Sequence, residues 1–153
     1  LKYATEIDSI GIAATYGYTG GNAGTQGTIA YNDLTEHTMS LELSFGGFTA
    51  DVRTHDKSDS GRVTADGSGG NESISYCGKY VTGAVSMAAC RIEDSFQTSL
   101  TTDNERDVNT ISGGYSLGGG VNVSAMYISV KEVDDVTTHT DASMILGILT
   151  VGF

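Results

Sequence analysis

The sequence predicts an all-β protein, an antiparallel transmembrane β-barrel to which this chain contributes eight strands. Apolar and polar residues alternate over stretches long enough to cross a bilayer as strands, and short glycine turns alternate with long polar connections. The chain of 153 residues also contains no proline. Proline has no N–H to donate, so its absence suits long strands whose backbone groups all join a ladder.

The alternation is clearest around the glycine turns, where the apolar faces of the two flanking strands agree. Phe45 leads into the turn at 46–47, and Phe48 leaves it on the same face. The turns at 83–84 and 118–120 are flanked in the same way. Each turn therefore joins two strands of one continuous sheet face.

Eight strands are expected, and they lie at 9–19, 37–45, 48–56, 72–82, 85–93, 106–117, 121–132 and 142–153. The long connections lie at 20–35, 57–70, 94–105 and 133–141. Because short turns and long connections alternate strictly, the turns lie at one rim and the connections at the other, as in outer-membrane barrels.

A spanning helix is not predicted. The longest apolar stretch, near 144–149, is far shorter than the roughly 18 residues that a transmembrane helix needs. Strands can cross a bilayer only in a closed barrel, because every backbone N–H and C=O must find a partner inside the protein.

The two faces of the expected sheet differ in character. The apolar face would meet lipid, and the aromatic residues expected at the membrane interface are Tyr16, Phe45, Phe48, Tyr80, Tyr115 and Phe153. The opposite face is polar or small almost throughout and would line the interior. The exceptions, apolar residues that would also face the interior, are Met126, Ile128, Met144, Leu146 and Ile148.

The net charge of −11 argues against a nucleic-acid partner, because a protein that neutralises phosphates gathers Lys and Arg. The acidic residues are expected in the long connections, where they would form a solvated surface. Among them are Glu93, Asp94 and the run at 103–107.

Three segments carry a family resemblance: the final strand ending in Phe153, the stretch YSLGGGV at 115–121 and the hairpin GAVSMAA at 83–89. They resemble the general porins of Gram-negative bacteria, particularly the alphaproteobacterial type. The resemblance implies that residues 1–153 are a porin β-barrel domain, the C-terminal half of a barrel of sixteen strands. We therefore expect the chain to be a fragment.

The resemblance also implies a location and partners. Such a protein would form a homotrimer in the cell outer membrane, surrounded by membrane lipid and lipopolysaccharide, and let ions and small hydrophilic solutes diffuse passively. The barrel-assembly machinery would recognise the C-terminal strand, Ile145 to Phe153. Acidic residues of the family's constriction loop have no counterpart in this chain.

Charged side chains on the interior face are the candidate pore-lining residues, because a pore discriminates through the charges on its wall. They are Glu42, Asp51, Arg53 and Lys79. The turn at 46–47 sets Glu42 opposite Asp51 and leaves Arg53 diagonal to Glu42. A structural ion cluster that holds the wall together is the alternative interpretation.

Cys77 and Cys90 are the only cysteines, and the turn at 83–84 places them directly opposite each other. A cross-strand disulfide and two free thiols both remain open. His37, His55 and His139 are scattered and have no chelating spacing, so no metal or other cofactor is expected. Without a nucleophile motif, the sequence predicts that the protein is not an enzyme.

Two other folds fit part of the pattern. A closed eight-stranded barrel would act as a structural anchor or adhesin without conductance, although the small interior residues would fill so narrow a lumen poorly. A secreted β-sandwich that binds sugars or surfaces would bury the apolar face between two layers.

Overall fold

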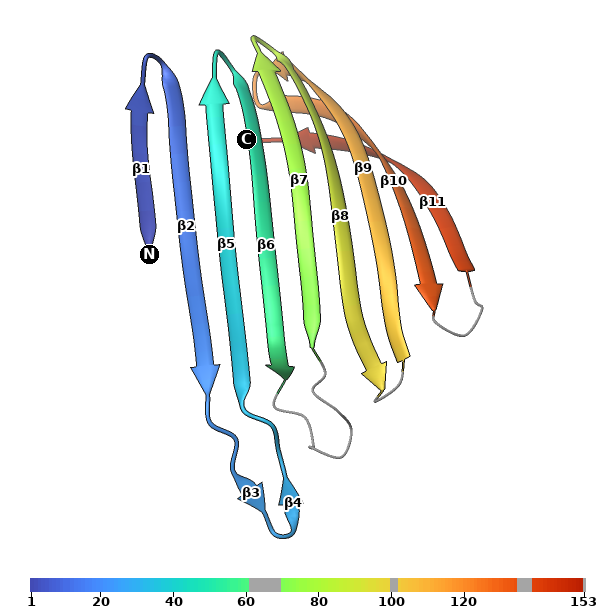
Figure 1. The fold of residues 1–153 in the computed structure, drawn as a ribbon. Helices are drawn as coiled ribbons and strands as arrows, with labels where there is room; N and C mark the ends of the chain where they lie inside the picture. The colour runs from blue at the N-terminus through green and yellow to red at the C-terminus, as the bar shows by residue number, and fades with distance from the viewer. Residues whose placement is uncertain (61–69, 100–101, 135–138, 153) are drawn as a thin grey trace.

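A computed structural model describes residues 1–60, 70–99, 102–134 and 139–152 of the chain. These residues form a nine-stranded antiparallel sheet in which each strand pairs with its neighbours in the sequence, and a separate two-stranded hairpin (Figure 1). The main sheet consists of β1 (Lys2–Ile7), β2 (Ile10–Gly21), β5 (Leu34–Phe45), β6 (Phe48–Ser60), β7 (Asn71–Thr82), β8 (Val85–Ser99), β9 (Thr102–Gly118), β10 (Val121–Asp134) and β11 (His139–Val151). The hairpin consists of β3 (Thr25–Gln26) and β4 (Ile29–Ala30).

The predicted count of eight strands is wrong, because β1 precedes the first expected strand. The turn between β1 and β2 is formed by Asp8 and Ser9, which have positive φ angles of 49° and 69°. Asp tolerates this left-handed conformation through local hydrogen bonds, and the other short turns use glycine for it. A search for glycine turns therefore misses the first hairpin.

Several strands extend further toward the long connections than the sequence predicts. The expected connection at 94–105 is mostly strand, since β8 continues to Ser99 and β9 begins at Thr102. The connection at 20–35 contains the β3–β4 hairpin. Polar and charged residues were interpreted as loop, but ladder hydrogen bonds hold a strand together outside an apolar environment as well.

The sheet is a single layer. Among the described residues no hydrophobic side chain is buried, and 27 large hydrophobic ones are exposed. A β-sandwich would press these side chains against a second sheet. The sandwich alternative is therefore wrong, and the apolar face has no partner within the described part of the chain.

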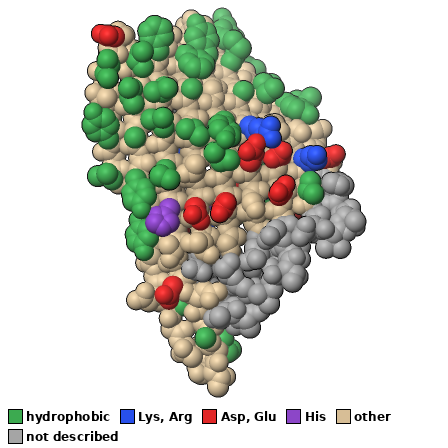
Figure 2. All heavy atoms as spheres, viewed as in Figure 1, with side chains coloured by type: hydrophobic (Ala, Val, Ile, Leu, Met, Phe, Trp, Pro, Cys, Tyr) green, Lys and Arg blue, Asp and Glu red, His purple; other side chains and the backbone are tan. Residues whose placement is uncertain are grey.

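The sheet is curved, and its apolar face lies on the convex side. In Figure 1 the ends of β10 and β11 bend away behind β7 and β8. Figure 2, seen from the same side, shows hydrophobic side chains covering the half of this face that lies near the short turns. On β10 the convex Val123 and Tyr127 are exposed, whereas the concave Met126 and Ile128 are half-buried, because side chains on a concave face crowd together.

The sheet is open in this structure. The two edge strands are β1 and β11, and β1 pairs only with β2 while β11 pairs only with β10 among the described residues. A closed eight-stranded barrel is therefore not what these strands form. No helix that could span a membrane occurs in the described ranges.

We predict that Gly47→Ala destabilises the sheet more than Gly46→Ala. Both glycines have positive φ, but an added Cβ at Gly47 would collide with the Val81 carbonyl oxygen, whereas at Gly46 it meets nothing. Losing glycine at positive φ costs about 1 to 2 kcal/mol at either site, and the collision adds to this at Gly47 only. The measurement is the urea concentration at the midpoint of unfolding. Folded and unfolded protein are distinguished by their different electrophoretic mobilities. Equal midpoints for the two variants would contradict the close approach of Gly47 to Val81.

Candidate functional site

The convex face carries an apolar band that follows the sheet around from β1 to β11. Its side chains are strongly exposed, with Ile111 at 62% and Leu149 at 66%. Such a continuous apolar surface on a protein with no second layer marks a contact with lipid or another protein.

The band does not follow the hydrogen-bonded register of the sheet. We call a line of residues that are paired across successive strands a registered row. On β5 the band extends away from the glycine turns as far as Met39, and the registered row of Met39 leads to the charged residues Glu93 on β8 and Asp107 on β9. On β9 the outward apolar residues begin only at Ile111, which lies nearer the short-turn rim. Barrel strands tilt by about 35 to 45° from the membrane normal, so a level band must cross successive strands at shifted positions.

The tyrosines on the side of the long connections shift in the same direction. Tyr16 on β2, Tyr76 on β7 and Tyr127 on β10 all point outward, and each lies two registered rows closer to the short-turn rim than the one before. Aromatic residues gather at the two membrane interfaces, where an amphipathic ring meets both lipid and water. The line of tyrosines therefore marks one boundary of the band.

Five of the six aromatic residues that the sequence singled out lie along the two boundaries of the band. Phe45, Phe48, Tyr80 and Tyr115 are exposed near the short-turn rim, and Tyr16 is 42% exposed on the opposite boundary. Phe153 lies outside the described residues.

His37 joins this boundary, although no role for it was expected from the sequence. The Tyr16 hydroxyl and His37 Nδ1 are 3.0 Å apart, within hydrogen-bond distance. The Tyr18 ring lies at a centroid distance of 5.1 Å from the imidazole. Cross-strand pairing of β2 with β5 brings the three rings together.

Beyond the tyrosines the convex face carries charges, visible as a red and blue belt in Figure 2. Arg91 contacts Glu93 at 2.8 Å and Asp107 at 3.3 Å. A shallow groove of about 730 Å³ runs along this belt and is lined by Asp56 and Glu72 among others. Glu93 and Asp107 were grouped with the acidic residues of the long connections, but they lie on β8 and β9, which continue past the apolar band.

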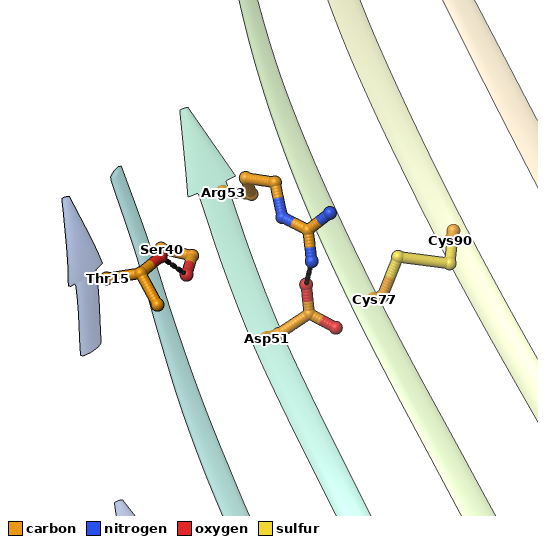
Figure 3. A network of polar contacts seen from close by, with 6 residues as sticks. All are labelled: Thr15, Ser40, Asp51, Arg53, Cys77 and Cys90. Atoms are coloured by element: carbon orange, nitrogen blue, oxygen red, sulfur yellow. Dashed lines mark hydrogen bonds and ion pairs between the residues drawn. A yellow bond between two sulfur atoms is a disulfide. The ribbon is translucent and has the colours of Figure 1, made fainter. Parts of the chain in front are cut away.

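The concave face carries the four charges predicted to line a pore. Glu42 lies opposite Asp51, as predicted from the turn at 46–47. Arg53 pairs at 3.8 Å with Asp51, which lies two residues away on the same face of β6, and not with the predicted diagonal partner Glu42 (Figure 3). Among the described residues, Glu42 and Lys79 form no ion pair. The Arg53 side chain is 65% exposed, so this pair stabilises the sheet by at most about 1 kcal/mol.

Cys77 and Cys90 form a disulfide on the same concave face, beside Asp51 in Figure 3. Cys90 is the registered partner of Cys77, and their Cα atoms are 4.2 Å apart. Cys77 is in turn the registered partner of Asp51 on β6. The disulfide thus ties β7 to β8 at the level of the charged side chains.

A second ion pair on the concave face was missed from the sequence. Arg106 donates from Nε at 3.0 Å and from a terminal nitrogen at 2.5 Å to the same oxygen of Asp94. The guanidinium carbon of Arg106 also lies 5.7 Å from the centre of the Phe96 ring. Asp94 was assigned to the long connection at 94–105 and Arg106 to the start of the next expected strand, so their registered pairing on β8 and β9 was not expected. The described residues include no group of three or more His, Cys, Asp and Glu side chains that could hold a metal ion.

A single curved antiparallel meander with an apolar convex face and a polar concave face is the fold of an outer-membrane β-barrel. A solved structure bears this out: the chain is similar to OmpTdeltaL8, a loop L8 deletion mutant of OmpT, an outer membrane protein of Vibrio cholerae, with a TM-score of 0.65 and 15% sequence identity. The similarity covers 94% of this chain and 49% of the Vibrio protein, so the chain spans about half of that protein's length. No protein-family model and no curated protein matches the chain.

The comparison supports part of the sequence-based identification. It supports the outer-membrane barrel fold and an outer-membrane location, but no particular type of porin. It also corrects the prediction that the protein is not an enzyme. The similarity extends to the fold alone, and one fold can carry unrelated functions. This barrel fold therefore gives no ground for excluding an enzymatic activity.

We predict that Arg106→Met destabilises the sheet by about 1 to 3 kcal/mol, and that Arg53→Met changes its stability by less than about 1 kcal/mol. The Asp94 side chain is only 9% exposed, so loss of Arg106 leaves a poorly hydrated carboxylate without its partner. Asp51 is better hydrated at 21%, and its partner Arg53 is mostly in solvent. The same substitution at both positions, compared by urea unfolding, provides the matched control. A larger loss at Arg53 would contradict this assignment.

Proposed function

We propose that the chain forms part of the wall of a water-filled channel in the cell outer membrane, a porin through which ions and small hydrophilic solutes diffuse. The observation that carries this proposal is the division of the sheet into two faces. The convex face bears an apolar band bounded by aromatic rings, and the concave face bears charged, hydroxyl and small side chains. Contact with lipid outside a barrel accounts for the apolar convex face, and contact with water inside it accounts for the polar concave face.

The small size of the concave residues supports a wide interior. Thr15 and Ser40 form a hydrogen bond of 2.5 Å between their hydroxyls, and the neighbouring rows contain glycine and alanine such as Gly11 and Ala13. An eight-stranded barrel is narrow enough that its interior side chains must fill it. Nine strands with small interior side chains, matching about half of a longer barrel, favour a wall section of a wider barrel.

The finer features follow from the resemblance to general porins. On that basis, we propose that the complete barrel has sixteen strands, assembles as a homotrimer, and contacts membrane lipid and lipopolysaccharide through the convex face. The C-terminal strand β11 would be the segment that the barrel-assembly machinery recognises. In this proposal, Glu42, Asp51, Arg53 and Lys79 line the pore.

The proposal predicts that Arg53→Gln combined with Lys79→Gln shifts ion selectivity toward cations. These two changes remove both positive charges from a group that also contains Glu42 and Asp51, so the wall becomes negative at this level. The measurement is the reversal potential of the full-length protein in planar bilayers under a salt gradient. The shift should shrink as the salt concentration rises, because screening weakens the field of the wall.

The matched control makes the same change of charge on the other face. Arg91→Gln combined with Lys131→Gln also removes two positive charges, but from the convex belt. Under the proposal this variant leaves the reversal potential nearly unchanged, because its charges do not face the pore. Equal shifts in the two variants would contradict the assignment of faces, and absence of ion conductance in the native protein would overturn the channel itself.

A further inference from the structure

One region of the concave face departs from the polar pattern of a channel wall. We define the inner apolar patch as the eight apolar residues on the concave side of β8 to β11: Ile92, Val108, Met126, Ile128, Val130, Met144, Leu146 and Ile148. Three of them are well exposed, with Met144 at 53%, Leu146 at 39% and Ile148 at 43%. So many apolar side chains are not expected at the water-facing positions of a channel.

A slipped strand register does not explain the patch. A slip by one residue would turn every side chain of a strand to the other face. On the same strands, Tyr115, Tyr127 and Leu149 remain on the convex face, as the apolar band requires. The inner apolar patch is therefore a property of the sequence in this fold.

The registered rows join the patch to the charged side of the wall. Arg53 on β6 pairs with Ser75 on β7, and Ser75 pairs with Ile92 on β8. From Ile92 the row continues through Val108 and Val130. Along this registered row the concave face thus changes from charged to apolar within two strands, which is about 10 Å across the sheet.

The charged side is balanced, with two acidic and two basic side chains: Glu42, Asp51, Arg53 and Lys79. Such a group complements a solute that carries both signs of charge, because each charge of the solute finds an opposite one. The inner apolar patch, which this registered row connects to the charged group, offers a surface for an apolar portion of the same molecule.

We propose that the channel favours small zwitterionic solutes with apolar side groups, of about the length of a dipeptide, which contact the charged group and the inner apolar patch together. This inference rests on the proposed channel function and names the class of solute. Such solutes would spend longer in the pore than equally charged polar ones, since apolar contact is added to the charge interaction.

The test compares two dipeptides of equal charge and nearly equal size, leucyl-leucine and asparaginyl-asparagine, as blockers of single-channel current in the full-length protein. The expected result is a residence time for leucyl-leucine that is at least about fivefold longer. In the variant Ile128→Ser combined with Met144→Ser this ratio should fall toward one. Ala88→Ser, which adds a hydroxyl on the concave face outside the patch, should leave the ratio unchanged.

The outcomes separate this inference from the channel function. Open channels with equal residence times for the two dipeptides would overturn the inference and leave the channel intact, whereas a native protein without conductance would overturn both. If part of the protein covers the patch, the double serine variant will unfold more easily and keep its ratio, which also overturns the inference. Ile128→Thr, a smaller change that keeps the β-branched shape, serves if the double variant does not fold.

Discussion

The backbone hydrogen-bond ladder is the constraint on which the rest of this structure depends. A sheet that stands in lipid must pair every N–H and C=O with a neighbouring strand, because hydrocarbon offers no partner. The absence of proline, the long strands and the pairing of each strand with its neighbours from β1 to β11 all serve this requirement. Once the ladder is in place, the alternation of side chains decides which face meets lipid and which meets water.

The stability of such a sheet does not come from a buried core. None of the described hydrophobic side chains is buried within the chain, so their removal from water depends on the surroundings of the convex face. The disulfide between Cys77 and Cys90 and the ion pair of Arg106 with Asp94 add local links between neighbouring strands. In a single-layer wall, such lateral links replace part of what packing supplies in a soluble domain.

The two faces carry different kinds of information about function. On the convex face, the apolar band and the tyrosines Tyr16, Tyr76 and Tyr127 shift across the register, as expected for strands that are tilted relative to a flat membrane. The concave face carries a balanced charged group on one side and the inner apolar patch on the other, and in the proposed channel these would determine which solutes pass. These two patterns are independent, because adjacent residues of a strand point to opposite faces.

By itself the sequence determined the all-β antiparallel fold, the eight strands of the main sheet that follow β1 and the register around the glycine turns, because period-two alternation and glycine at positive φ are local signals. It placed Glu42 opposite Asp51 and Cys77 opposite Cys90 for the same reason. It did not find β1 or the outer parts of β8 and β9, since the turn at Asp8 and Ser9 lacks glycine and polar strands outside lipid resemble loops. Only the tertiary structure decided that Arg53 pairs with Asp51, that Arg106 meets Asp94, and that the sheet curves with its apolar face on the convex side. Side-chain partners and curvature depend on the packing of neighbouring strands, so the alternation of apolar and polar residues along one strand does not predict them.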